Sequence, residues 1–167
     1  LNVLGKPILA VPGNFDKKLI PFFEEKNILL HGNGKIVKNI GFYGFGGAKT
    51  PFNTPLEISE EEIENGLMKG YDQIKDCNIK IQVTHTPPSN TKVDIVYTGA
   101  HVGSEAVRRF IEKHKPNVAV CAHIHEAKGT DEIGYTKIIN AGRFPEGYCG
   151  LVTIERDKTE TKIINLI

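Results

Sequence analysis

The chain has 167 residues, of which 40% are hydrophobic and 25% are charged, and its 21 basic and 20 acidic residues leave a formal net charge of +1. This composition is that of a globular protein, and the near-zero charge gives no whole-chain signal for nucleic acid or for an anionic membrane. No hydrophobic stretch approaches the roughly 20 residues that span a bilayer, and the first residues lack the layout of a signal peptide, so we expect a cytoplasmic protein.

Hydrophobic periodicity and turn residues predict an α/β first part and a β-rich end. Strands are expected over residues 8–11, 79–84, 117–122, 135–140, 150–155 and 161–167, and the segments 28–34 and 35–47 together are expected to form two or three more. Helices are expected over residues 15–27, 59–76 and 104–115, and residues 93–99 fit either a strand or a loop. Only turns separate the last three strands, which predicts an antiparallel run. Without repeats or a linker, residues 1–167 are expected to form a single domain.

Three local signals refine this prediction. The pair Asn33 and Gly34 is typical of a hairpin turn. Ser59 and Glu62 have the spacing of a capping box, which predicts the start of a helix. The glycine-rich residues 41–50 lack the glycine that directly precedes Lys-Thr in a phosphate-binding loop, so we expect them to let the backbone pass close to a crevice or to form a bend.

Polar clusters follow four of the predicted strands. They are PGNFD at residues 12–16, THTPP at 84–88, AHIH at 122–125 and NAGRFPEG at 140–147. In open α/β sheets the carboxyl ends of neighbouring strands form the ligand crevice, because side chains converge there on rigid supports. The recurrence of polar residues at these positions predicts a binding site.

Three of these clusters carry candidate metal ligands. Imidazole nitrogens of His85, His123 and His125 suit zinc, iron, manganese or nickel, and Asn14 offers a neutral amide oxygen. If residues 122–125 are extended, His123 and His125 point to the same side and could meet one metal ion or two adjacent ions. The alternative for each histidine is a turn residue with an ordinary hydrogen bond.

Two further residues are candidates for phosphate binding. His101 precedes the amino end of a predicted helix, where backbone N–H groups favour anions, although an exposed loop histidine is equally consistent with the sequence. Arg143 offers the forked donors that suit phosphate, but it also fits a solvated surface arginine. His31 and His114 have no polar cluster around them and are expected to be structural.

The order and types of these clusters resemble the calcineurin-like metallophosphoesterase family. Residues 13–16 (GNFD) are similar to its Gly-Asn-His-Asp/Glu block, 84–88 to its strand-end histidine, 122–125 to its Gly-His-x-His block and 140–147 to its closing Asn-x-Gly loop. The likeness is greatest to the small prokaryotic and archaeal phosphoesterases. It implies an α/β fold, a β-sandwich flanked by helices (αββα), and hydrolysis of a phosphomonoester or phosphodiester by a water that two divalent ions activate.

The resemblance also implies roles for individual residues. Metal ligands are expected at Asn14, His85, His123 and His125, the first three for one ion and His125 for the other. Phosphate-binding residues are expected at Asn14, His101 and Arg143. The two ions would be manganese, iron, nickel or zinc, and the substrate a phosphorylated small molecule or nucleotide. The oligomeric state stays open.

The chain departs from the family pattern in the GNFD block. Phe15 stands where the family has a histidine that aids phosphate binding or protonates the leaving group, so no catalytic acid is identified. Asp16 would have oriented that histidine, and its role is therefore open. Ala122 replaces a glycine, which is a mild change.

The family's first two blocks, Asp-x-His and Gly-Asp, have no counterpart in the sequence. We therefore expect the chain to lack the first strand-helix-strand unit, with an Asp-x-His about 60 residues before Leu1. The chain by itself is expected to hold half of the ligand set. The alternative function is a degenerate, non-catalytic member that binds a phosphorylated ligand or a partner protein.

Overall fold

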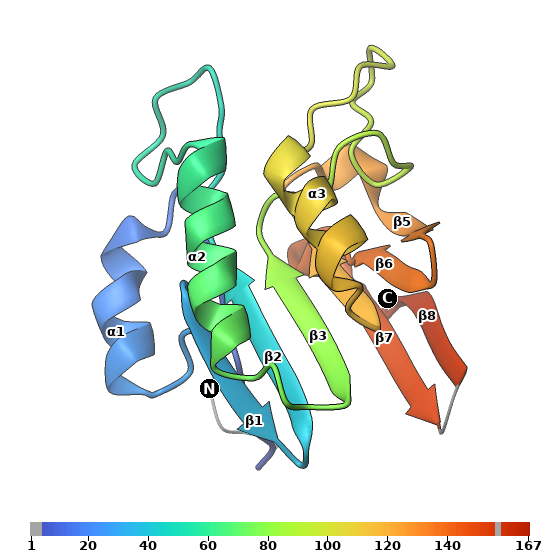
Figure 1. Ribbon diagram of the computed structural model, residues 1–167. Coiled ribbons are helices and arrows are strands. Elements are labelled where there is room, and N and C mark those ends of the chain that lie inside the picture. Colours follow the sequence, from blue (N-terminus) through green and yellow to red (C-terminus); the bar gives the residue numbers. More distant parts are fainter. Residues whose placement is uncertain (1–4, 156–157) are drawn as a thin grey trace. The chain divides into compact units, whose positions relative to one another are not determined.

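A computed structural model describes residues 5–155 and 158–167 (Figure 1). The chain divides into two compact units, unit 1 over Leu1–His85 and unit 2 over Thr86–Ile167. No helix within the described residues is long and apolar enough to cross a membrane. The single-domain organisation stays a prediction.

Unit 1 is a three-stranded sheet with helices. Its elements are η1 (Lys17–Leu19), α1 (Ile20–Glu25), β1 (Asn33–Val37), β2 (Ile40–Phe45), α2 (Glu60–Asp72) and β3 (Ile79–Thr84). The central strand β2 is antiparallel to β1 and parallel to β3. Helix α2 packs on β1 and β2 (Figure 1), and its residues Ile63 and Leu67 are buried. The parallel pair sends the ends of β2 and β3 to the same edge of the sheet, and this edge carries His85.

The turn predicted at Asn33 and Gly34 is wrong, because both residues lie in β1. The hairpin turn is formed by Lys38 and Asn39, whose φ angles are 49° and 66°, and a two-residue turn with positive φ at both positions matches the twist of the flanking strands. Gly34 serves a packing purpose, since a Cβ there would collide with the carbonyl oxygen of Gly70 in α2. Close approach of helix and strand thus explains this glycine.

The capping box of α2 is confirmed. Glu62 N donates to Ser59 Oγ at 3.1 Å and Ser59 N donates to Glu62 Oε2 at 2.7 Å. The helix ends at Asp72, four residues before the predicted end. The strand predicted over residues 8–11 is wrong: a single bridge joins Ala10 to Leu29, and prolines at both sides of the segment limit the ladder because they lack an N–H group.

Unit 2 contains a three-stranded sheet, a separate hairpin and one long helix. Its elements are α3 (Glu105–His114), β4 (Val118–Cys121), η2 (His125–Ala127), β5 (Gly129–Ile133), β6 (Thr136–Asn140), η3 (Phe144–Glu146), β7 (Tyr148–Glu155) and β8 (Lys158–Asn165). Strand β6 is parallel to β4 and antiparallel to β5. Strands β7 and β8 pair antiparallel in a sheet of their own. The antiparallel end of the chain is thus confirmed for β7 and β8, whereas β6 belongs to the other sheet.

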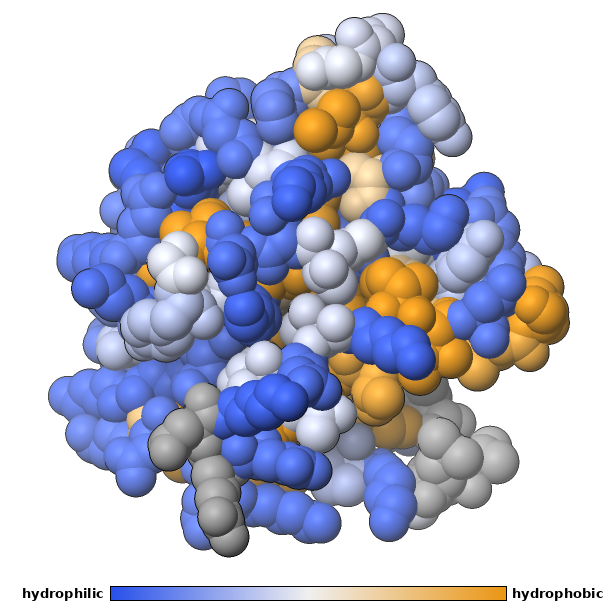
Figure 2. Space-filling model, turned by 90° about the vertical axis from the view of Figure 1, so that its right-hand side faces the viewer, coloured by the Kyte–Doolittle hydropathy of each residue, from blue (hydrophilic) through white to orange (hydrophobic). Residues whose placement is uncertain are grey.

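The sequence did not predict β5, and residues 93–99 prove to be a loop with one bridge, Ile95 to His101. The segment of β5, GTDEI, is mostly polar because this strand lies at the edge of the sheet. Hydrophilic side chains also cover most of the face in Figure 2, where hydrophobic residues gather in separate areas. Exposed aromatic residues of unit 2 include Tyr97, in a loop, and Phe144, the first residue of η3.

Candidate metal and phosphate site

The PGNFD segment of unit 1 forms a closed turn. Asp16 N donates to Gly13 O at 3.0 Å, and the Asp16 carboxylate accepts the Gly13 N–H at 2.9 Å. Asp16 therefore has a structural role, which is to hold the turn shut. Phe15 lies at the tip of the turn and is 72% exposed.

The turn brings Asn14 to His85. Asn14 is buried, and its Oδ1 lies 3.0 Å from His85 Nε2, although the two residues are 71 positions apart. The backbone N–H of His85 donates to Phe45 O at the end of β2, and this bond fixes the backbone of the histidine. Two donors bound at about 2.1 Å to one metal ion with a right angle between them lie roughly 3 Å apart. The amide oxygen and the imidazole nitrogen thus fit two ligands of a single ion.

Glycines make this approach possible. A Cβ on Gly13 would lie 2.9 Å from Asp16 Oδ2 and 3.2 Å from His85 Cε1, tighter than ordinary contacts. A Cβ on Gly46 would collide with Pro12. The N–H of the next residue, Gly47, donates to the carbonyl oxygen of Pro12 at 2.9 Å. The glycine-rich segment therefore lets the backbone pass close to the turn, as one of the two sequence interpretations had it.

A loop of residues 48–58 supports Asn14 from its other side. Leu56 N donates to Asn14 O at 2.9 Å. Glu57 closes this loop, because its carboxylate accepts bonds from the backbone N–H and the hydroxyl of both Thr50 and Thr54. These bonds, the one from the Thr50 N–H first, lower the pKa of Glu57 from 4.5 to about 2.

The depressed pKa of Glu57 predicts an acid-sensitive loop. A carboxyl whose folded-state pKa lies below its unfolded value adds stability above the unfolded pKa and loses it as the pH falls through the folded pKa. We expect Glu57→Gln to be less stable than wild type at pH 7, and the difference to shrink between pH 4.5 and about 2. Urea unfolding at several pH values measures this, and a difference that is constant with pH would contradict it.

The His-x-His segment of unit 2 is not extended, so the conformation on which the expected common direction of the two histidines depended is wrong. Ile124 N donates to Ala122 O at 2.8 Å, and His123 between them has a φ of +66°. These features define a γ-turn with a positive φ at its centre, a rare and strained conformation. His125 lies beyond this turn and begins η2.

A buried amide holds this turn to two neighbouring loops. Asn140, at the end of β6, is fully buried, and its Nδ2 donates to Ile124 O at 2.8 Å and to Val93 O at 3.3 Å. Its Oδ1 accepts the Gly142 N–H at 3.1 Å. One side chain thus fixes the peptide between His123 and His125, the loop that contains Val93, and the start of the NAGRFPEG segment.

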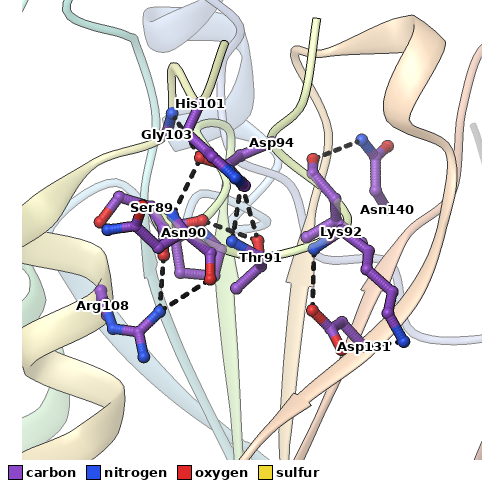
Figure 3. Close-up of polar contacts among 12 residues, drawn as sticks. Ser89, Asn90, Thr91, Lys92, Asp94, His101, Gly103, Arg108, Asp131 and Asn140 are labelled. Carbon is purple, nitrogen blue, oxygen red and sulfur yellow. Dashed lines mark hydrogen bonds and ion pairs between the residues drawn. The ribbon is translucent and has the colours of Figure 1, made fainter. Parts of the chain in front are cut away.

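The loop before α3 is organised around Asp94 (Figure 3). This carboxylate is fully buried and accepts the His101 Nδ1–H at 2.7 Å. It also accepts hydrogen bonds from Asn90 N at 3.1 Å, Thr91 N at 2.8 Å, Thr91 Oγ1 at 3.3 Å and Gly103 N at 3.0 Å. His101 is therefore an anchored, partly exposed side chain. Its proposed contact with phosphate stays a prediction.

Arg143 lies at the surface, where its Nη1 donates to Glu146 Oε1 at 2.7 Å. Its role in phosphate binding also stays a prediction. Within residues 5–155 and 158–167, no group of three or more histidine, cysteine, aspartate or glutamate side chains is arranged to hold a metal ion. The structure brings Asn14 and His85 together in unit 1, and His123 and His125 follow the same strand in unit 2. The four-residue ligand set stays a prediction.

Sequence reasoning missed Asp94 and the role of Asn140. Asp94 lies in a loop without periodicity, and its partners are three to nine positions away. A carboxylate among turn residues is a weak sign of a functional residue, because such residues are common in turns. Asn140 could have been found from its place at the end of a strand, next to Ala141 and Gly142.

One family model and several known proteins match this chain. The family described as metallophosphoesterase, calcineurin superfamily, matches residues 1–164. The uncharacterized protein MJ1162 of Methanocaldococcus jannaschii is 41% identical over 147 residues, which cover 84% of this chain and 65% of that protein. The chain therefore spans somewhat less than two thirds of the length of this relative.

Solved structures with a similar fold also match this chain. One crystal structure matches with a TM-score of 0.78 at 24% identity, over 98% of this chain and 67% of that chain. The crystal structure of TT1561 of Thermus thermophilus matches with a TM-score of 0.70 at 23% identity, over 97% of this chain and 74% of that chain. At these identities the likeness concerns the fold alone.

Proposed function

Because this chain belongs to the metallophosphoesterases of the calcineurin superfamily, we propose that it takes part in hydrolysing a phosphomonoester or phosphodiester with a water that two divalent ions activate. Members of the superfamily are generally hydrolases that bind divalent metal ions. The mixed α/β fold is of the metallophosphoesterase type, as the sequence implied. The proposed ions are manganese, iron, nickel or zinc, and the proposed location is the cytoplasm.

The observation that carries the proposal is the meeting of Asn14 and His85. An amide oxygen and an imidazole nitrogen from distant parts of the chain lie 3.0 Å apart at a strand end. We propose that Asn14, His85, His123 and His125 are metal ligands.

Ions held by Asn14, His85, His123 and His125 would lower the pKa of a bound water and neutralise phosphate oxygens. The chain's own residues position the reactants. Asn14, held by Leu56 N at its carbonyl oxygen and by the closed turn, offers an amide that can also face a phosphate oxygen. His101 and Arg143 are the further phosphate-binding candidates of unit 2. A phosphorylated small molecule or nucleotide is the proposed substrate class.

The alternative function is a non-catalytic family member that binds a phosphorylated ligand or a partner protein. The observation that favours it is Phe15, an exposed phenylalanine at the tip of the turn that carries Asn14. A phenyl ring cannot move a proton, so the turn contains no side chain of its own for acid catalysis while Asp16 is engaged with Gly13.

Metal content and turnover distinguish the two functions. We expect the protein at its natural length to bind close to two manganese ions and to hydrolyse bis(4-nitrophenyl) phosphate, with both lost after chelation and restored by manganese. We expect His85→Ala to lower turnover at least about 100-fold. His31→Gln is the matched control, because His31 accepts the Gly46 N–H at 3.0 Å and glutamine keeps an acceptor. One ion or none, without turnover, would support the binding protein instead.

A further inference from the structure

In unit 2, outside the proposed ligands, Asp94 and His101 form a hydrogen-bonded carboxylate–imidazole pair. Asp94 is fully buried, and its two oxygens accept five hydrogen bonds, four from backbone and hydroxyl donors and one from His101. An ionised carboxylate can only accept, so the proton in the shared bond belongs to His101 Nδ1. The buried carboxylate therefore fixes the tautomer and the orientation of the ring.

The other ring nitrogen of His101 is available. Within the described residues Nε2 makes no hydrogen bond, and the side chain is 39% exposed. An imidazole held at Nδ1 by a buried carboxylate presents Nε2 to a reactant in the arrangement that proton-transfer enzymes use. In the imidazolium form the second proton lies on Nε2.

The pair is joined to the His-x-His turn through Asn140. Nδ2 of this residue bonds both Val93 O, next to Asp94, and Ile124 O, between His123 and His125. These two bonds tie the loop that contains Asp94 to the segment that carries the proposed ligands.

The remaining histidines of the chain are engaged elsewhere. His31 accepts a backbone N–H and stacks on Phe45 at 4.0 Å, and burial lowers its pKa. His114 stacks on Phe110 at 4.2 Å within α3. Apart from His85, His123 and His125, which are proposed as ligands, there remains His101, which combines a carboxylate partner with a partly exposed ring.

We infer that His101, oriented by Asp94, is the general acid that protonates the leaving oxygen of the phosphoester. This inference rests on the proposed hydrolysis. A water oxygen that has lost a proton to solvent forms the new bond to phosphorus, and the bond to the leaving oxygen breaks with both electrons passing to that oxygen. The leaving oxygen takes the proton from His101 Nε2, and the neutral imidazole regains a proton from solvent.

Dependence on the leaving group tests this role. The natural-length, manganese-loaded protein is assayed with 4-nitrophenyl and simple alkyl phosphoesters, because 4-nitrophenolate leaves without a proton and an alkoxide does not. We expect His101→Gln to lower kcat at least about 100-fold for the alkyl ester and less than about fivefold for the nitrophenyl ester. Asp94→Asn is expected to show a smaller loss with the same dependence, and long-range ¹H–¹⁵N spectra to show the Nδ1–H tautomer of His101 in wild type.

Arg108→Gln is the matched control. Arg108 Nη1 donates to Ser89 O and to Asn90 O, both at 2.9 Å, so it holds the same loop without touching His101. Any fall in kcat in Arg108→Gln is expected to be equal for the two esters. An equal loss for both esters in His101→Gln, or a rise in KM alone, overturns the inference in favour of a structural or phosphate-binding role. If wild type hydrolyses neither ester, the proposed function fails too; if His101→Gln keeps alkyl turnover, the inference alone fails.

Discussion

Replacing His123 by glycine is expected to leave a more stable protein than replacing it by alanine, while both changes remove activity. His123 has a φ of +66° in the γ-turn. A side chain in this left-handed region costs roughly 1–2 kcal/mol, and glycine escapes the cost because it has no Cβ. We therefore expect the glycine variant to exceed the alanine variant by about 1 kcal/mol in urea unfolding. Both are expected to lose at least about 100-fold in turnover through the missing imidazole.

Asn39 offers a matched control for this prediction. It has the same φ of +66°, but in the hairpin turn between β1 and β2. Asn39→Gly and Asn39→Ala are expected to differ in stability in the same direction as the His123 pair, with no loss of turnover or of bound manganese. Equal stability of the two His123 variants would show that the turn carries no strain. Unchanged turnover in both would remove His123 from the metal ligands.

Strain at His123 bears on why the site could be predicted only in part. The four polar clusters were visible in the sequence because each follows a short, well-bounded apolar run. Three of these runs are strands, such as β3 before His85, and the run before Asn14 forms a single bridge. The conformation of the chain after β4 could not be predicted from the sequence. The segment Ala122 to His125 contains neither glycine nor proline, so nothing local indicates a γ-turn. Bonding of Ile124 O to Asn140 fixes it from a distance of 16 residues.

The fold also has parts that local sequence predicts and parts that distant contacts determine. Helices α2 and α3 were predictable from Ser59 and Ser104, whose hydroxyls accept the N–H groups of Glu62 and Val107, and from their apolar faces. Asn33 and Gly34 misled because a strong local turn signal was overridden by packing of Gly34 against α2. Local sequence thus determined the elements that carry their own caps. Tertiary contacts determined the loops that carry the candidate site.

Replacing Asn140 by alanine is expected to destabilise unit 2 by about 3 kcal/mol, since two buried carbonyl groups, those of Val93 and Ile124, lose their donor. Asn140→Asp has nearly the same shape but puts an oxygen beside these carbonyls. We therefore expect it to be at least as unstable as Asn140→Ala. Urea unfolding measures both effects, and hydrogen exchange in residues 92–94 and 123–125 is expected to rise in both variants.

Asn65, exposed in α2, is the control for removal of an asparagine side chain. Alanine there is expected to change stability by no more than about 0.5 kcal/mol. If Asn140→Asp proved as stable as wild type, the hydrogen bonds from Nδ2 would not hold the loops. Loosening of the loops in Asn140→Ala should also reduce turnover, because Asp94 with His101 and the turn at His123 are joined through this one amide. A fully active but unstable Asn140→Ala would mean that the two loops keep their places without it.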